Sequence, residues 1–251
     1  SVVEQDNKPA PNNIKNKIGV LPDYSTFYDD LNGIEHLNFF SKLLGVNNSK
    51  SDLMKLLELV ELQDAAYVKA KKYSFGMKKK LGIAQALVNN PDLIFLDEPT
   101  SGVDANAVLS IHSLIRKIAN KGKTIFLTSH NLDEVEKLCD EIAIMNKGVI
   151  EVQGSLQQLR QQFQTHIKVI IKHSVISIKE EESLSLILNS LSDDVEQTAE
   201  NITTIIVKNE SIIPKVNNAF LDQKIDIYRV EVEELSLEKI FLNIDSFKKT
   251  L

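Results

Sequence analysis

The sequence predicts an α/β fold in which a parallel sheet is built from strands that alternate with amphipathic helices. Short apolar segments such as residues 93–96 have the composition of strands buried on both faces of a parallel sheet. Between such segments, apolar residues recur at the three- and four-residue spacing of a helix packed on one side. Helix-ending signals separate them, for example Asp104 as an N-cap and Gly122 as a stop. This alternation is typical of a sheet with helices packed against it.

The first expected elements precede residue 100. Residues 1–13 are polar with two prolines and are expected to form a short strand and a loop, and residues 15–22 form an apolar strand that ends at Pro22. Two helices follow, one stopped by Gly45 and the other covering about residues 52–62. A third helix leads into the apolar strand of residues 91–99. The first and third helices are defined by Ile34, Leu37, Phe40 and Leu44, and by Met77, Leu81, Ala84 and Val88.

The same alternation continues after residue 100. A helix follows Asp104 and ends at Gly122, and residues 123–130 form another buried strand. Residues 140–148 and 149–154 are two strands joined by a tight turn. Two pairs of residues have the spacing of a capping box and would each open a helix: Asn131 with Glu134, and Ser155 with Gln158.

The last third of the chain differs in composition, and we expect a domain boundary near Thr165. All nine glycines lie at or before Gly154, and residues 165–251 carry 10 Lys and Arg against 15 Asp and Glu. Since glycine marks tight turns and close approaches to ligands, this part is expected to be an accessory α/β domain. The inward-facing alternation of its third strand slips between Ile227 and Tyr228, which indicates a bulge or an edge position. Its expected strands are residues 166–178, 202–207 and 225–232, each followed by a helix.

The composition excludes a disordered protein, a collagen-like repeat and a disulfide-stabilised miniprotein. The chain has 251 residues, of which 43% are hydrophobic and 25% charged, as in an ordinary globular protein. No apolar run exceeds four residues, whereas a membrane-spanning helix needs about 20. Cys139 is the only cysteine, which favours a reducing, cytoplasmic compartment. The net charge of -6 argues against nucleic-acid binding, so the lysine group near residues 69–80 is interpreted as a solvated basic face.

The strongest chemical signal is the segment LIFLDEPTSGVD, which covers residues 93–104. Its strand ends in Asp97 and Glu98, at the sheet edge where ligands of open α/β folds bind. One of these acids can hold a hydrated Mg²⁺, and the other is free to polarise a water molecule. His130 ends the next strand at the same edge, and Asp23 follows the first strand. Ser74 and Gly76 open a helix, whose N-terminus favours anions.

Taken in order and spacing, these segments resemble the nucleotide-binding subunit of ATP-binding-cassette (ABC) transporters over about residues 14–163. The resemblance implies an ABC ATPase of the P-loop type over residues 1–164, with a helical subdomain over about residues 24–90. It implies ATP and Mg²⁺ as cofactors, Glu98 as the catalytic base and His130 as the switch histidine. It implies nucleotide or Mg²⁺ contacts from Asp97, Asp23, the signature residues Ser74, Phe75, Gly76 and Met77, and Asp104 in the loop that crosses a cassette dimer.

Three departures from the family pattern stand out. Phe75 replaces the first glycine of the signature, and Asp23 replaces the glutamine of the loop that senses the membrane partner. The phosphate loop GxxxxGKS or GxxxxGKT is not found, because Gly122, Lys123 and Thr124 lack the earlier glycine and precede a strand. Either an amino-terminal portion is missing from this chain, or the subunit is a degenerate cassette that does not bind ATP itself. The presence of Glu98 and His130 favours the first explanation.

The amino-acid sequences of residues 73–87 and 236–244 are most similar to those of cassettes that pair with separate export permeases, such as drug, antibiotic and bacteriocin-immunity exporters. The expected function is therefore ATP hydrolysis that powers a membrane exporter from the cytoplasmic face of the membrane. The expected partners are a polytopic permease and a second cassette, most simply another copy of this chain. The alternatives are a non-transport ABC ATPase and an ATP-free structural subunit.

Overall fold

The computed structural model describes residues 17–23, 27–192 and 194–247, which divide into two units between Leu138 and Cys139. The strand and loop expected over residues 1–13 lie outside the described residues. This division comes earlier in the chain than the domain boundary that we expect near Thr165. The end of the ATPase domain near Thr165 stays a prediction. Within the described ranges, no helix is both long and apolar enough to cross a membrane.

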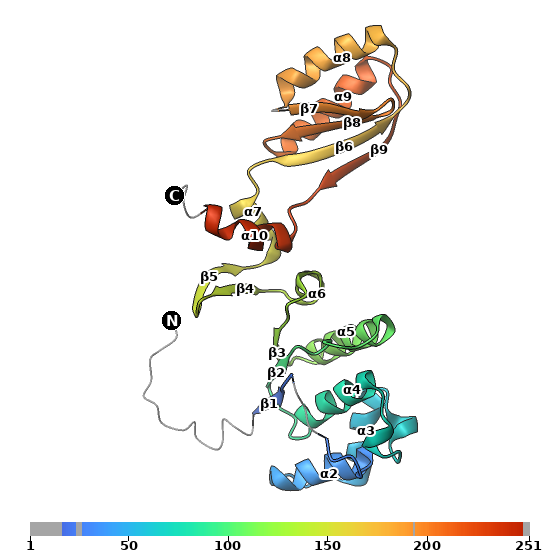
Figure 1. The fold of residues 1–251 in the computed structure, drawn as a ribbon, viewed down its shortest axis with the longest axis vertical. Helices are drawn as coiled ribbons and strands as arrows, with labels where there is room; N and C mark the ends of the chain where they lie inside the picture. Colours follow the sequence, from blue (N-terminus) through green and yellow to red (C-terminus); the bar gives the residue numbers. More distant parts are fainter. Residues whose placement is uncertain (1–16, 24–26, 193, 248–251) are drawn as a thin grey trace. The chain divides into compact units, whose positions relative to one another are not determined.

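The first unit is built around three parallel strands, and the order β1-β2-β3 brings distant segments together (Figure 1). Leu93 of β2 pairs with Ile18 of β1 on one side and with Thr124 of β3 on the other. The parallel register aligns the carboxyl ends of the strands at one edge, as the sequence predicts. The bounds are β1, Ile18–Leu21; β2, Leu93–Asp97; and β3, Thr124–Thr128.

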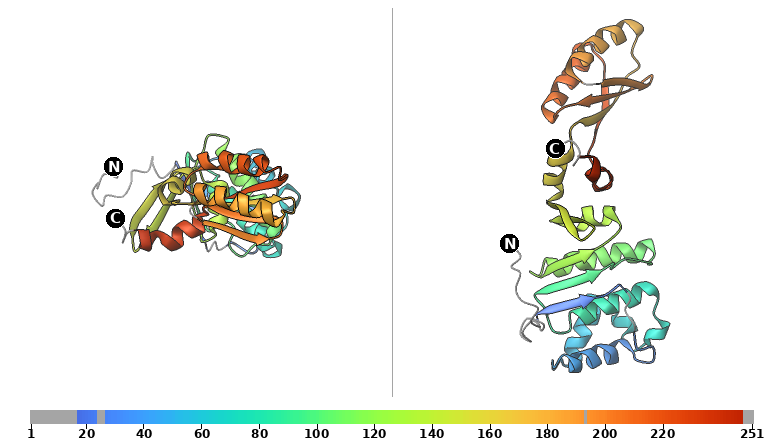
Figure 2. Two further views of the ribbon diagram at one scale, coloured as in Figure 1. Left: turned by 90° about the horizontal axis from the view of Figure 1, so that it is seen from above. Right: turned by 60° about the vertical axis from the view of Figure 1, so that its left-hand side comes forward.

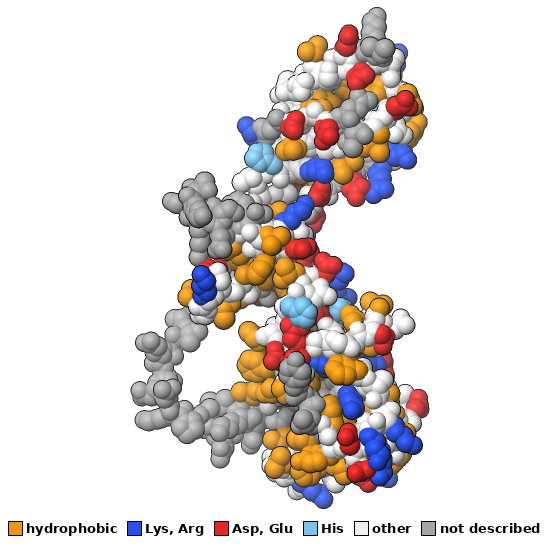
Figure 3. Space-filling view, in the orientation of Figure 1, with side chains coloured by type: hydrophobic (Ala, Val, Ile, Leu, Met, Phe, Trp, Pro, Cys, Tyr) orange, Lys and Arg blue, Asp and Glu red, His pale blue; other side chains and the backbone are white. Residues whose placement is uncertain are grey.

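Helices cover one face of this sheet (Figure 2, right). On that face Leu21, Ile94 and Leu96 are buried in the main hydrophobic core. Gly19 of β1 packs against α4 so closely that a Cβ atom there would lie 2.1 Å from the carbonyl oxygen of Ala86. On the opposite face Phe126 is exposed, so the expected burial of both faces is wrong for the described residues. Figure 3 shows hydrophobic side chains gathered beside the strands and over α2.

The helices of the first unit begin at side-chain caps. Asn32 with Glu35 forms a capping box at α2, and Ser49 with Asp52 forms one at α3. The second helix therefore starts at Lys50, earlier than expected, because Ser49 accepts from the Asp52 N–H. The bounds are α2, Gly33–Leu43; α3, Lys50–Leu59; α4, Phe75–Ala86; α5, Ala105–Ala119; and α6, Leu132–Leu138, with 3-10 turns at Gln63–Ala65 and Ala70–Lys72.

The second unit starts with the antiparallel pair β4, Ile142–Asn146, and β5, Val149–Gly154. Helix α7, Leu156–Phe163, begins with the predicted capping box of Ser155 and Gln158. It packs on β5 and on the terminal helix α10, Leu237–Phe247, which explains why these elements group with the second unit.

The rest of the second unit is a βαββαβ arrangement whose sheet order, β7-β8-β6-β9, is that of the ferredoxin-like fold. All neighbouring strands are antiparallel. The bounds are β6, Ile167–His173; α8, Ile178–Leu191; β7, Asp194–Ala199; β8, Ile202–Val207; α9, Ile213–Asp222; and β9, Ile227–Glu233, with a 3-10 turn at Glu210–Ile212.

The predicted slip in the third strand of this unit is confirmed. His173 pairs with Ile227 and Lys172 pairs with Arg229, so Tyr228 is an extra residue in β9, which lies at the sheet edge. Two other expectations are wrong: the strand expected to reach residue 178 ends at His173, and β7 was not expected. The Ser177 hydroxyl caps α8, which ends the extended segment.

Candidate functional site

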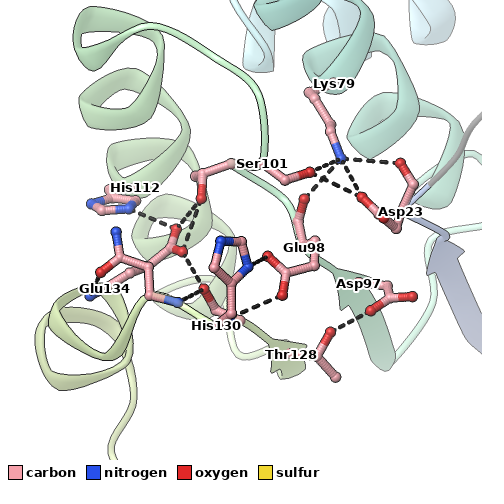
Figure 4. Close-up of polar contacts among 12 residues, drawn as sticks. Asp23, Lys79, Asp97, Glu98, Ser101, His112, Thr128, His130 and Glu134 are labelled. Carbon is pink, nitrogen blue, oxygen red and sulfur yellow. Dashed lines mark hydrogen bonds and ion pairs between the residues drawn. The ribbon is translucent and has the colours of Figure 1, made fainter. Parts of the chain in front are cut away.

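The site lies at the carboxyl edge of the β1-β2-β3 sheet, where β2 ends (Figure 4). Asp97 is the last residue of β2, and Glu98 follows it with a φ of 48°, in the left-handed region that non-glycine residues rarely occupy. The Glu98 N–H donates to the Thr128 carbonyl at 3.1 Å, which extends the contact with β3 by one residue. The two carboxylates are thus held at the end of a buried strand by the sheet itself.

Glu98 and His130 form the most direct polar contact among the predicted residues. The His130 N–H donates to Oε1 of Glu98 at 2.9 Å, and Nδ1 of His130 lies 2.8 Å from Oε2. The imidazole itself is 80% exposed. Hydrogen bonding to the Glu98 carboxylate, together with its negative charge, raises the pKa of His130 above its ordinary value of 6.5.

Asp97 points from the same edge and is exposed. Its Oδ1 accepts a hydrogen bond from the Thr128 hydroxyl, its partner in the β2–β3 register. Within the described residues this is the only hydrogen bond to the carboxylate, and the residue as a whole is exposed. A carboxylate of this kind fits a hydrated Mg²⁺, which binds proteins through one or two carboxylates and keeps several waters. The described residues contain no group of three or more His, Cys, Asp or Glu side chains that could enclose a metal ion by themselves.

Lys79 is the hub of a second group of contacts that sequence reasoning missed. Lys79 lies on α4 and its side chain is only 6% exposed, so its interpretation as part of a solvated basic face is wrong. Its ammonium group donates to the Glu98 carbonyl at 2.8 Å, the Asp23 carbonyl at 3.1 Å and the Ser101 hydroxyl at 3.2 Å. A signal was available, because Lys79 shares a helical face with the buried residues Gly76 and Ile83.

The structure brings Asp23 into this second group. Its Oδ1 accepts from the Ser101 hydroxyl at 2.9 Å and from the Lys79 ammonium at 3.4 Å. Three segments, from the end of β1, α4 and the loop after β2, therefore meet around one buried ammonium group (Figure 4). The ammonium group of Lys79 neutralises the negative charge of Asp23, which weakens its attraction for a cation. Of the two predicted metal ligands, Asp97 therefore fits Mg²⁺ better.

The predicted signature residues open α4 as expected. The Ser74 hydroxyl is the N-cap and accepts from the Met77 N–H at 3.2 Å. Phe75 is exposed, and its ring is so close to Gly102 that a Cβ there would lie 3.0 Å from Cε1. A Cβ on Gly76 would lie 2.8 Å from the Cβ of Ala107, so glycine is needed where α4 meets α5.

Asp104 caps α5, as predicted, by accepting from the Ala107 N–H at 3.0 Å. The start of α4 and the start of α5 are thus neighbours in space. No hydrogen bond or ion pair between the described residues joins Ser74–Met77 or Asp104 to Glu98 and His130. The predicted site residues therefore fall into three groups: Glu98 with His130 and Asp97, Asp23 with Lys79 and Ser101, and the paired helix starts.

Glu134 is a further residue whose position sequence reasoning misjudged. Asn131 does accept from the Glu134 N–H, but the Glu134 carboxylate does not return to cap the helix. It is buried and accepts from the Thr100 hydroxyl at 2.8 Å and the Ser129 hydroxyl at 2.7 Å, and it lies 2.8 Å from Nε2 of His112. These contacts tie the loop after β2 to the segment that carries His130.

The arrangement is suited to activating water next to a charged ligand. The Glu98 carboxylate has lone pairs left to accept a hydrogen bond from water, and the contacts to His130 fix its orientation. Asp97 adds a second negative charge for a hydrated cation, and Lys79 holds the loop between them and α5. Positioning and charge neutralisation are the main requirements of phosphoryl transfer.

Comparisons with known proteins find ATP-binding subunits of ABC transporters, in agreement with the resemblance seen in the sequence. A family model described as ABC transporter matches residues 2–101. The chain is 31% identical over 226 residues to the bacitracin transport ATP-binding protein BcrA of Enterococcus faecalis, covering 90% of this chain and 71% of that protein. A solved structure described as the ATP binding subunit of an ABC transporter superposes with a TM-score of 0.54 at 28% identity, covering 61% of this chain and 65% of that one.

Other relatives are longer than this chain. It is 34% identical over 242 residues to ABC transporter A family member 9 of Arabidopsis thaliana, covering 92% of this chain and 25% of that protein. It is 41% identical over 150 residues to the uncharacterized ABC transporter ATP-binding protein all4389 of Nostoc, covering 58% of this chain and 45% of that protein. The chain thus spans between a quarter and a half of these two relatives.

Proposed function

Because the chain belongs to the family of ABC transporter ATP-binding proteins, we propose that it is the ATP-hydrolysing subunit of a membrane exporter. The observation that carries the proposal is the Glu98 carboxylate, held by His130 next to the exposed Asp97 at the end of β2. The similarity to a bacitracin transport protein over most of both chains supports export.

In the proposed reaction, Glu98 accepts a hydrogen bond from the attacking water and orients it toward the terminal phosphate of ATP. His130 holds Glu98 and, from its exposed ring, contacts that phosphate. Asp97 would hold Mg²⁺, with Asp23 as a second contact through water. When bound, Mg²⁺ would neutralise charge on the phosphate oxygens. Lys79 keeps the backbone of Glu98 in place through its hydrogen bond to the Glu98 carbonyl.

We further propose that a second copy of the cassette completes the nucleotide site. Ser74, Gly76 and the adjoining N–H groups at the start of α4 would bind the phosphates of ATP held by the other copy. The exposed Phe75 and the neighbouring Asp104 would lie on the same contact surface. A helix N-terminus favours bound anions because its unpaired N–H groups carry partial positive charge.

The permease is proposed to dock on residues after Asp23, roughly 24–44, at the cytoplasmic face of the membrane. The described part of this segment exposes Tyr28, Phe39 and Leu43. Tyr28 and Phe39 stack edge to face with ring centroids 5.0 Å apart, which presents a rigid apolar surface to a partner. The exported substrate would be selected by the permease.

Nucleotide binding is the first test, because the sequence contains no GxxxxGKS or GxxxxGKT segment. We expect the natural full-length protein, purified with its permease, to bind Mg-ATP and hydrolyse it. Failure to bind nucleotide would instead support the ATP-free structural subunit. Hydrolysis without any co-purifying polytopic protein would support a non-transport ABC ATPase.

A further inference from the structure

Strand β9 leaves one edge of the second unit's sheet open. Among the described strands it pairs only with β6, and it lies at the end of the order β7-β8-β6-β9 (Figure 1). Its outer N–H and C=O groups are therefore available to another extended strand. Edge strands of this kind are common sites of strand addition by a partner.

The side chains of β9 form two distinct rows. Val230 and Val232 pair with Ile171 and Val169, which are fully buried under the helices, yet each valine is itself 37% exposed at the edge. On the other face, a guanidinium nitrogen of Arg229 lies 2.5 Å from Oε2 of Glu231, and both side chains remain largely exposed. The edge thus combines an apolar row that the sheet leaves half covered with a row of opposite charges.

The order of these residues is self-complementary in an antiparallel pairing. If two copies of β9 run in opposite directions around a two-fold axis at Val230, each Arg229 faces Glu231 of the second copy. Val230 then faces Val230, so the half-exposed apolar side chains at the two edges cover each other. Opposite charges and apolar pairs directly across antiparallel strands are both stabilising.

Neighbouring registers lack this match. A two-fold axis at Arg229 would place two arginines opposite each other, and an axis at Glu231 would do the same with two glutamates. Like charges directly opposite each other destabilise a strand pair. The charge pattern therefore favours the register centred at Val230, because it is the one of these three that pairs every charge of Arg229 and Glu231.

We propose that β9 is a self-association edge that pairs with β9 of a second copy of this chain, antiparallel and centred at Val230. The contact is isologous, as in most two-fold dimers. It is separate from the nucleotide-dependent contact proposed above, and it uses none of the residues of the candidate site. A single strand pair buries less area than a stable interface requires, so the association is expected to be weak and concentration-dependent.

Cysteine cross-linking in the full chain tests the register. Cys139 is the only native cysteine, so Cys139→Ser supplies a cysteine-free background. In this background Val230→Cys places two thiols on the two-fold axis, where paired Cα atoms are about 4.5–5.5 Å apart, a distance that a disulfide can bridge. Tyr228→Cys is the matched control, because its two copies would lie four positions apart along the strands.

We expect mild oxidation of concentrated protein to give several-fold more cross-linked dimer with Val230→Cys than with Tyr228→Cys. Equal cross-linking of the two variants, or none with Val230→Cys, would overturn the proposal. Cross-linking of Val230→Cys to a cysteine placed at Val195 in β7, the other edge, in preference to itself would also overturn it, since that contact is head-to-tail. Circular dichroism checks that each variant is folded.

Charge reversal gives an independent test that needs no cysteine. Arg229→Glu places two acids opposite two acids and should abolish the concentration-dependent dimer in sedimentation velocity. The double variant Arg229→Glu with Glu231→Arg restores every opposite-charge pair and should restore the dimer. Failure of the double variant to rescue association, while it remains folded, would count against the pairing. Neither change touches Glu98 or His130, so nucleotide hydrolysis should be unaffected.

Discussion

The two oxygens of the Glu98 carboxylate accept from one residue, His130, through its backbone N–H at 2.9 Å and its Nδ1 at 2.8 Å. Glu98 and His130 come from the ends of two neighbouring strands, and the β2–β3 register brings them together. The pair fixes the direction of the carboxylate while leaving the imidazole exposed.

The first prediction concerns the titration of His130. Its pKa is raised above 6.5 by the hydrogen bond and negative charge of Glu98. The stabilisation from this pair is thus fully present below about pH 6.5 and is lost as the pH rises through the raised pKa. In Glu98→Gln the His130 pKa should fall back toward its ordinary value, as measured by NMR of the ring protons. An unchanged pKa in this variant would show that the contact does not persist in solution.

The second prediction concerns hydrolysis. If Glu98 is the base, Glu98→Gln in the natural full-length protein with its permease should lower ATP turnover by about 10²–10⁴-fold, the usual contribution of a positioned general base. Nucleotide binding should remain. Glu58→Gln, a change of an exposed acid on α3, is the matched control and should leave turnover unaffected. Turnover near wild type in Glu98→Gln would show that the base is another residue.

The third prediction concerns the buried Lys79. Lys79→Met keeps the length of the side chain but removes the ammonium group that joins Asp23, Ser101 and the Glu98 carbonyl. We expect a loss of roughly 3 kcal/mol in the free energy of unfolding, because the Asp23 carboxylate loses its charged partner and the Asp23 and Glu98 carbonyls lose a donor. Chemical denaturation measures this loss.

Lys78→Met is the control for Lys79, since its ammonium lies 4.0 Å from an exposed Asp29 carboxylate. An exposed pair contributes less than about 1 kcal/mol. Equal losses in the two variants would contradict the assignment of Lys79 as a buried hub. We also expect Lys79→Met to lower ATP turnover, because Lys79 holds the backbone carbonyl of Glu98.

The fourth prediction concerns Glu61, which accepts from Lys80 at 2.8 Å and from the Ser110 hydroxyl at 2.7 Å. The hydrogen bond from Lys80, followed by that from Ser110, lowers the pKa of Glu61 from 4.5 to about 2. Its stabilisation is therefore present above pH 4.5 and is lost as the pH falls toward 2. Because the carboxylate is half exposed, we expect only about 0.5–1 kcal/mol.

Glu61→Gln tests this, since glutamine keeps the size of the side chain at a backbone φ of 60°. Its unfolding free energy should lie below that of the wild type at pH 7, and the difference should disappear by about pH 2. Thermal or chemical unfolding across this range measures it. A difference that stays constant with pH would mean that the contact acts through packing and not through charge.

Much of the local structure could be predicted from the sequence. The cap at Asp104, the box of Ser155 and Gln158, the start of α4 at Ser74 and the slip at Tyr228 all agree with the structure. These features depend on residues a few positions apart. Strand β7 was missed because polar and acidic residues interrupt its apolar pattern, and its pairing with β8 supplies the hydrogen bonds that form it.

The sequence by itself determined the alternation of strands and helices up to residue 163, the residues at the carboxyl edge of the sheet and the resemblance to ABC cassettes, because spacing along the chain carries all three. Only the tertiary structure decided which groups surround the buried Lys79 and Glu134, and that β9 both carries a bulge and lies at a sheet edge. A buried charge is stable only when it is paired or hydrogen-bonded. The partners of Lys79 come from 19 to 56 residues away, so no local pattern could reveal them.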